Sequence, residues 1–184
     1  RWRRGRVIVT EQFDAKNSQW NTRFSQGLVN ETMKIRIKYH ADIPKLRSAH
    51  VGEWIDLYAA EDKFIPLGEY KLISLGVSIE LPDGYEAIVA PRSSTFKNFG
   101  IVCSCSFGVI DNLYKGDNDV WMFPAICKKD MSKEWDFARQ GTQIHKGDRI
   151  AQFRIQEQQI PFEFEEVESL GNPDRGGIGS TGKR

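Results

Sequence analysis

The feature that most restricts the fold is a series of short apolar stretches, separated by turn signals, that begins near Met33. Lys34–Tyr39 alternates polar and apolar residues, as a half-buried strand does. Many short strands at this spacing are typical of an all-β sandwich, jelly roll or barrel. We expect further strands over 70–81, 85–90, 100–110, 120–127, 149–156 and 162–167, with turns at 82–84, 116–119 and 146–148. The one helix expected covers Asp130–Gln140, with Ser132 as a possible cap.

Charge and glycine content divide the chain into three parts. Residues 1–32 carry a net charge of +3, whereas the whole chain carries +1. Because this shift in composition ends at Met33, we expect residues 1–32 to be an N-terminal extension, with the natural start at Met33. The alternative for 1–32 is a basic arm that binds acidic surfaces. Residues 33–170 are expected to form one β domain. The segment 171–184 holds five of the 16 glycines and is expected to be a flexible C-terminal arm.

Composition excludes several classes of protein. No apolar run reaches the length of a membrane-spanning helix, and the near-neutral charge argues against a dedicated nucleic-acid binder. The cysteines are odd in number and lack a CxxC pair, which argues against a disulfide framework or a zinc site and favours a cytoplasmic protein. The histidines, which are His40, His50 and His145, show no metal-ligand spacing. The cysteines are Cys103, Cys105 and Cys127.

Three segments carry residues suited to chemistry, and each also has a purely structural explanation. The tail from Arg175 to Gly182 combines glycines, hydroxyls and an arginine, which suit an anion, although a flexible polar tail has the same composition. Pro91-Arg92-Ser93-Ser94-Thr95 is either a phosphate clamp or a capped turn. In the segment 108–116, Asp111 is either a general base on water or a turn former, and Tyr114 offers a ring face.

Taken together and in order, these segments resemble the five motifs of the trimeric dUTPases (dUTP diphosphatases), in particular a divergent branch from Gram-positive bacteria and their phages. The resemblance covers residues 50–184. The segments similar to the motifs are Ile55–Ala60, Pro91–Ser94, Gly108–Gly116, Gly147–Phe153 and Arg175–Gly182.

The resemblance implies a jelly-roll-like distorted β-barrel subunit in a homotrimer, with three active sites at subunit boundaries. It implies hydrolysis of dUTP to dUMP and pyrophosphate, which keeps uracil out of DNA and supplies dUMP for dTMP synthesis. Asp111 is then the general base that takes a proton from the water attacking the α-phosphorus. Mg²⁺ is expected as the cofactor, held by the triphosphate rather than by direct protein ligands. Asp56 is expected to reach the metal through water or to orient Arg92.

The same resemblance assigns the substrate contacts. The motif-three hairpin binds the uracil edge, Tyr114 stacks under the deoxyribose and excludes a 2′-hydroxyl, and the arm closes over the nucleotide. The expected substrate-binding residues are Arg92, Ser93, Ser94, Gly108, Ile110, Tyr114, Gln152, Arg175, Gly179, Ser180 and Thr181.

The chain also departs from the family pattern. Trp54 precedes motif one and is expected to be structural. Ile178 stands where the family has an aromatic that caps the uracil, so Phe96 or Phe99 is considered for that role, with a core position favoured for Phe99. Cys105 stands where an asparagine is usual. Residues 128–142 form an expected exposed insertion suited to partner recognition.

Two alternatives stay open. The fold also hosts dCTP deaminases, which need a catalytic glutamate that the motif-three segment lacks. The other alternative is a phage-type dUTPase that acts as a regulatory protein-binding switch through the insertion or the N-terminal arm. We expect no membrane and no nucleic-acid partner.

Overall fold

The computed structural model describes residues 8–14, 19–25, 33–47, 54–132 and 140–174. Apart from one short helix, α1 (Thr95–Phe99), all regular elements of these residues are strands, and every strand pair is antiparallel. The predicted mostly-β chain is therefore confirmed. No helix in this part of the chain is long and apolar enough to cross a membrane.

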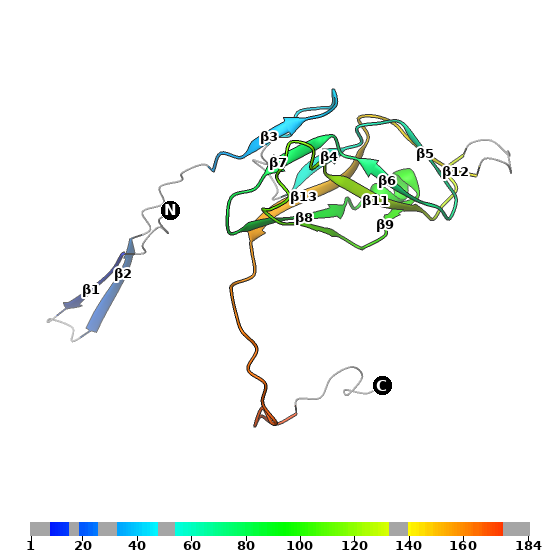
Figure 1. Cartoon of the computed structure of the whole chain (residues 1–184). Helices are drawn as coiled ribbons and strands as arrows, with labels where there is room; N and C mark the ends of the chain where they lie inside the picture. The colour runs from blue at the N-terminus through cyan, green and yellow to red at the C-terminus, as the bar shows by residue number, and fades with distance from the viewer. Residues whose placement is uncertain (1–7, 15–18, 26–32, 48–53, 133–139, 175–184) are drawn as a thin grey trace.

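Two larger sheets build the body of the protein. The four-stranded sheet has the order β10 (Gly108–Ile110), β8 (Tyr85–Pro91), β13 (Arg149–Glu157) and β4 (Ile55–Tyr58). The three-stranded sheet has the order β6 (Tyr70–Ser74), β11 (Met122–Cys127) and β9 (Ile101–Cys103). The two-stranded sheets are β12 (Gly141–Ile144) with β5 (Lys63–Pro66), β3 (Arg36–Tyr39) with β7 (Val77–Glu80), and β1 (Ile8–Asp14) with β2 (Gln19–Ser25). Figure 1 shows how these strands are arranged.

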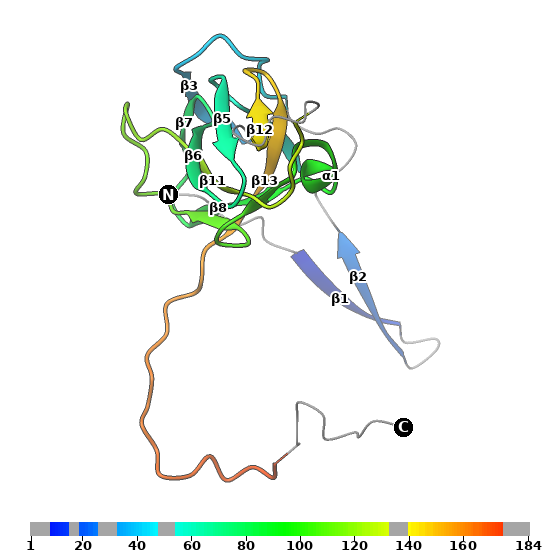
Figure 2. The same cartoon turned by 90° about the vertical axis from the view of Figure 1, so that its right-hand side faces the viewer.

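The inner faces of the sheets meet in one apolar core. Figure 2 shows the strands of the body surrounding a common interior. Trp121, just before β11, lies edge-on to Phe153 of β13 with ring centroids 5.1 Å apart, and this contact joins the two larger sheets. Both side chains are buried, as are the inward residues Leu57, Ile73 and Phe123. Burial of these large side chains is the main force that holds the layers together.

Several predicted strands form, but two of them are interrupted. The stretch 70–81 divides into β6 and β7 at Gly76, whose φ of +66° lies in the left-handed region. A Cβ there would lie 2.7 Å from Cβ of Ala60, so this turn needs glycine. The stretch 100–110 divides into β9 and β10 at a turn closed by the Ser106 N–H, which donates to Cys103 O at 3.3 Å.

Other predictions differ from the structure. The strand expected over 162–167 is wrong: these residues have no regular structure and Phe164 is 92% exposed, because no strand of the described chain pairs beyond the end of β13. The helix expected over 130–140 falls mostly on 133–139, outside the described residues. Its described flanks are not helical. There the Asp130 carboxylate accepts the N–H groups of Gly141 at 2.9 Å and of Ser132 at 3.0 Å, and these bonds lower its pKa.

Sequence reasoning missed helix α1 and the strands β4, β5 and β12. Each of these strands has four residues, and no alternation of polar and apolar residues continues beyond the strand, as it does over Lys34–Tyr39 ahead of and along β3. Helix α1 begins after Ser94 and ends at Gly100, whose φ of 66° is the left-handed conformation typical of helix ends. Strands β1 and β2, within the predicted N-terminal extension, pair only with each other among the described strands.

Candidate functional site

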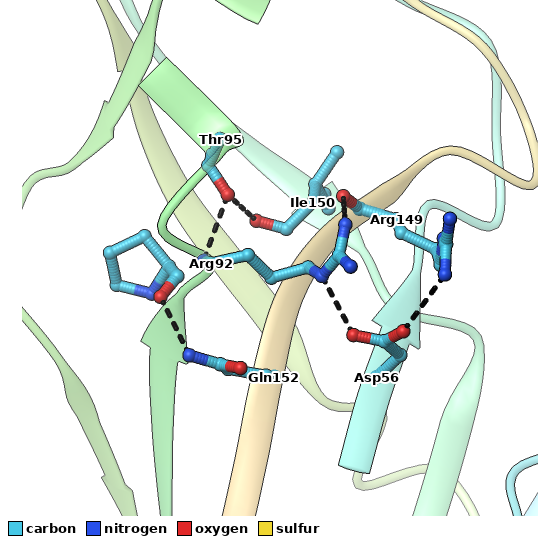
Figure 3. A network of polar contacts seen from close by, with 7 residues as sticks. Asp56, Arg92, Thr95, Arg149, Ile150 and Gln152 are labelled. Carbon is cyan, nitrogen blue, oxygen red and sulfur yellow. Dashed lines mark hydrogen bonds and ion pairs between the residues drawn. The ribbon is translucent and has the colours of Figure 1, made fainter. Parts of the chain in front are cut away.

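Strand register brings together residues from three of the predicted motifs. Gln152 on β13 lies opposite Asp56 on β4 and opposite Ala90 on β8. Directly opposed residues of antiparallel strands project to the same face of the sheet. Because Arg92 follows the end of β8, the side chains of Asp56, Arg92 and Gln152 gather at one end of these three strands, as Figure 3 shows.

The Asp56 carboxylate lies between two guanidinium groups. Its Oδ1 accepts Arg92 Nε at 2.7 Å, and its Oδ2 accepts Arg149 Nη1 at 3.3 Å. Nη1 of Arg92 also donates to the backbone oxygen of Arg149 at 3.5 Å. The Asp56 and Arg92 side chains are half-buried, at 30% and 23% exposure, which makes this pair stronger than an exposed one. The contacts hold the Arg92 guanidinium in place and leave its Nη2 without a partner among the described residues.

Thr95 fixes the turn that carries Arg92. Its fully buried hydroxyl accepts the Arg92 N–H at 2.9 Å and donates to the backbone oxygen of Ile150 at 3.0 Å. The Thr95 N–H donates back to Arg92 O at 3.0 Å. One of the three hydroxyls that follow Arg92 is therefore structural. Ser93 is exposed and Ser94 is half-buried, and the Ser94 side chain makes no helix-capping bond.

Gln152 completes this half of the site. Its Nε2 donates to Pro91 O at 3.2 Å, which ties β13 to the end of β8 and holds the amide beside Arg92. Three side chains that suit phosphate oxygens thus cluster here: the guanidinium groups of Arg92 and Arg149 and the amide of Gln152.

A cavity of about 620 Å³ opens beside Asp56 and brings in cations that sequence reasoning did not mark. Lys45 and Arg47 line it together with Trp54. The Lys45 ammonium lies 3.8 Å from the centroid of the Tyr39 ring, a cation–π contact that holds it at the rim. These residues precede motif one, and no motif of the family resemblance pointed to them. Arg149 lies within motif four, and the family resemblance assigns it no role.

The predicted base Asp111 lies in a different turn, at the end of β10. Its Oδ1 accepts the N–H groups of Leu113 at 2.8 Å and of Tyr114 at 3.2 Å, which closes a tight turn of the Asx type. The Tyr114 hydroxyl donates to Val120 O at 3.2 Å. In the single chain the Asp111 side chain is exposed.

Within one chain, Asp111 is far from the Arg92 cluster. Ile110 pairs with Ala87, whereas Arg92 follows Pro91. Four residue steps along β8 separate Ala87 from Pro91, and this distance is about 14 Å at 3.4 Å per residue. A general base must lie within hydrogen-bond reach of the proton that it removes. A single chain therefore does not bring Asp111 and Arg92 to the same phosphate.

The remaining predicted residues have mixed outcomes. Gly108 and Ile110 lie on β10, an edge strand that pairs only with β8 among the described strands. Of the two aromatics considered as a uracil cap, Phe99 packs against the core, as favoured, and Phe96 is exposed. Residues predicted in the arm lie outside the described residues: Arg175, Ile178, Gly179, Ser180 and Thr181.

Comparison with known proteins gives consistent similarities. The dUTPase family model matches residues 39–182. The SPbeta prophage-derived deoxyuridine 5′-triphosphate nucleotidohydrolase of Bacillus subtilis strain 168 is 51% identical over 153 residues, which are 83% of this chain and 100% of that protein.

Two solved structures show the same fold. The dUTPase of Staphylococcus bacteriophage 80alpha with dUPNHPP has a TM-score of 0.63 and 22% identity, covering 82% of this chain and 99% of that one. A dUTPase variant from phage phi11 of S. aureus, described for its coordination of a structural Mg(II) ion, has a TM-score of 0.59 and 20% identity, covering 75% of this chain and 99% of that one.

The role of Thr95 is testable by removing its hydroxyl at constant shape. Thr95→Val leaves the Arg92 N–H and the Ile150 carbonyl buried without their partner, so the free energy of unfolding is expected to fall by about 2 kcal/mol or more. Thr95→Ser keeps both bonds and loses one methyl group, at about 1 kcal/mol. Urea unfolding at one fixed protein concentration measures both. Equal losses in the two variants would contradict a hydrogen-bonding role.

Proposed function

Because the chain belongs to the dUTPase family and hydrolyses dUTP, we propose that neighbouring copies share each active site, with Asp111 as the general base. The observation that carries this proposal is the separation of Asp111 from the Arg92 cluster along β8. A second copy that places its Asp111 turn against this cluster makes the site complete. The jelly-roll-like homotrimer expected from the family supplies three such boundaries.

One copy contributes the phosphate-binding half. The Arg92 guanidinium, held by Asp56, binds phosphate oxygens, and the hydroxyls of Ser93 and Ser94 donate to the same groups. The amide of Gln152, which is held by its bond to Pro91 O, contacts the α-phosphate or the attacking water in this proposal. The arm residues Arg175, Gly179, Ser180 and Thr181, contributed by a neighbouring copy, close over the γ-phosphate.

The other copy contributes the nucleoside-binding half. The unpaired edge of β10 leaves backbone groups of Gly108 and Ile110 to bond the uracil edge. Tyr114, held by its bond to Val120 O, packs under the deoxyribose and leaves no room for a 2′-hydroxyl. Asp111 takes a proton from water, the water oxygen bonds to the α-phosphorus, and the bond from that phosphorus to the bridging oxygen breaks. The products are dUMP and pyrophosphate.

Mg²⁺ fits this site as a companion of the triphosphate. Among the described residues no group of three His, Cys, Asp or Glu side chains is placed to hold a metal, and arginines occupy both oxygens of Asp56. Such a site suits a metal that the triphosphate chelates, with Asp56 reaching it through water. When bound, Mg²⁺ neutralises charge on the pyrophosphate leaving group.

A regulatory role is a second candidate function. Phage dUTPases, in the description of the 80alpha structure, control transfer of virulence genes. The corresponding candidate here is the insertion 128–142, whose base is closed by the Asp130 bonds to Gly141 and Ser132.

The relatives found are dUTP nucleotidohydrolases, so the deaminase alternative is set aside.

Asp111 is tested by pyrophosphate release with Mg²⁺ from dUTP, alongside dTTP, dCTP and UTP. We expect turnover of dUTP alone, and a loss of roughly 10²-fold or more in kcat for Asp111→Asn, because the amide cannot accept the proton from water. The control Asp117→Asn changes a carboxylate of the same loop that pairs only with the exposed Lys38, and it should keep its rate. Full turnover by Asp111→Asn would remove Asp111 from the mechanism.

The shared site is tested by mixing two inactive variants. Asp111→Asn and Arg92→Gln are unfolded together and refolded into mixed oligomers. If each site takes Asp111 from one copy and Arg92 from its neighbour, random mixing leaves about a quarter of the sites intact. Activity should therefore appear in the mixture, although each variant alone is inactive. Separately refolded variants, combined afterwards, are the control. No recovery would mean that one copy supplies both groups.

The insertion is tested by deleting 133–139 and joining the flanks with a short glycine linker. The deletion should leave dUTP turnover unchanged, because the Arg92 cluster and β10 lie on other elements. It should abolish co-purification of any protein partner that the full chain retains from a host or phage lysate. Retention of such a partner by the deletion variant would rule out the insertion as the contact.

A further inference from the structure

The turn between β9 and β10 holds two cysteines side by side. Cys103 is the last residue of β9, and Cys105 follows in the turn. Their sulfur atoms lie 3.5 Å apart. The turn brings them together: the Ser106 N–H donates to Cys103 O at 3.3 Å, and the Phe107 N–H donates to Cys105 O at 2.7 Å. The third cysteine, Cys127, lies on β11 and is buried.

Little movement separates this pair from a disulfide. A sulfur–sulfur bond is about 2.05 Å long, so the two atoms must approach by about 1.5 Å. Ser104, Cys105 and Ser106 are exposed, so this part of the turn moves without disturbing the core. Ser106 has a φ of +64°, an uncommon conformation for a residue with a side chain, which shows that the turn is tightly wound. Cys103 stays anchored through the pairing of β9 with β11.

The two thiols differ in reactivity in a way that suits stepwise oxidation. Burial raises the pKa of the Cys103 thiol to about 11, so this sulfur is mostly protonated at neutral pH. Cys105 is exposed to solvent and meets an oxidant first. Burial also raises the pKa of Cys127, whose Sγ donates to Lys129 O at 3.3 Å, and this thiol takes no part in the pair.

We propose that Cys103 and Cys105 are a dithiol modification site that a peroxide converts to an intrachain disulfide. The Cys105 thiol releases its proton, and the thiolate attacks one peroxide oxygen. The O–O bond breaks, the leaving hydroxide takes up the released proton, and the products are a sulfenic acid at Cys105 and one water. The Cys103 sulfur then attacks the Cys105 sulfur, the S–O bond breaks, and a second water leaves with the Cys103 proton. The two thiols are oxidised together and the peroxide is reduced to two waters, so atoms and electrons balance.

The position of the turn gives the disulfide a consequence for the reaction. The turn leads from β9 in the three-stranded sheet to β10 in the four-stranded sheet, and Asp111 directly follows β10. Drawing Cys105 toward the anchored Cys103 pulls on Phe107 and on the start of β10. The disulfide therefore slows dUTP turnover, a consequence that rests on the proposed role of β10 and Asp111.

The test begins with chemistry that does not depend on activity. The full chain is treated with hydrogen peroxide and examined by thiol titration and intact mass. We expect titratable thiols to fall from three to one per chain, with a mass loss of two hydrogens and full reversal by dithiothreitol. After digestion without reductant, the disulfide should lie within a peptide that contains both Cys103 and Cys105 but not Cys127. Retention of all three thiols, or a disulfide between two chains, would overturn the proposal.

Matched variants assign the pair. Cys127→Ser should still lose two thiols, because Cys127 lies on β11 opposite Ile101 and outside the turn that holds Cys105. Its dUTP turnover should equal that of the wild type. Cys105→Ser should keep both remaining thiols. Cys103→Ser should stop at the sulfenic acid, which dimedone traps at residue 105. Disulfide formation that requires Cys127 would contradict the assignment.

Turnover of dUTP before and after oxidation tests the effect of the disulfide on catalysis separately from its formation. A several-fold, dithiothreitol-reversible loss in the wild type and in Cys127→Ser, with no peroxide effect in Cys105→Ser, is the expected result. A disulfide that forms without slowing turnover would overturn the link to β10 alone. A reduced wild-type chain that fails to hydrolyse dUTP would instead count against the proposed function, whatever the thiol titration shows.

Discussion

The site depends on the ion pairs that Arg92 and Arg149 form with the Asp56 carboxylate. Removing one partner of such a half-buried group leaves a charge with poor solvation, and this cost exceeds the small net gain from forming the pair. The arrangement therefore favours one geometry more than it adds stability. The Thr95 hydroxyl reinforces that geometry by linking the Arg92 backbone to β13. A guanidinium fixed in advance loses little freedom when phosphate arrives.

Antiparallel register imposes the second constraint. Strand β8 carries Arg92 beyond one end and pairs with the end of β10 near its other end. No side-chain rotamer spans that separation, and a short edge strand has little freedom to slide. On the proposed assignment, Asp111 reaches the Arg92 cluster only from a second copy, and the geometry of this one strand then links catalysis to oligomer formation.

The sequence predicted much of this structure, and the limits have physical causes. Strands near 85–90, 120–127 and 149–156 follow from apolar patterning between turns, and they formed as expected. Strand β4, with Asp56, is too short for such a pattern. The structural use of Thr95, next to Ser93 and Ser94, depends on a backbone oxygen 55 residues away. The distance between Asp111 and Arg92 depends on register, which residue types near either position do not encode.

The edge strand β10 shows how one local choice affects several properties. On the side away from β8 it pairs with no described strand, which leaves backbone groups open on that side. An open edge must then be held from its ends. At one end the Asp111 turn is closed by its own carboxylate, and at the other the Cys103–Ser106 turn joins it to the neighbouring sheet. A chemical change at either turn therefore acts directly on β10, because β8 is the only described strand that pairs with it.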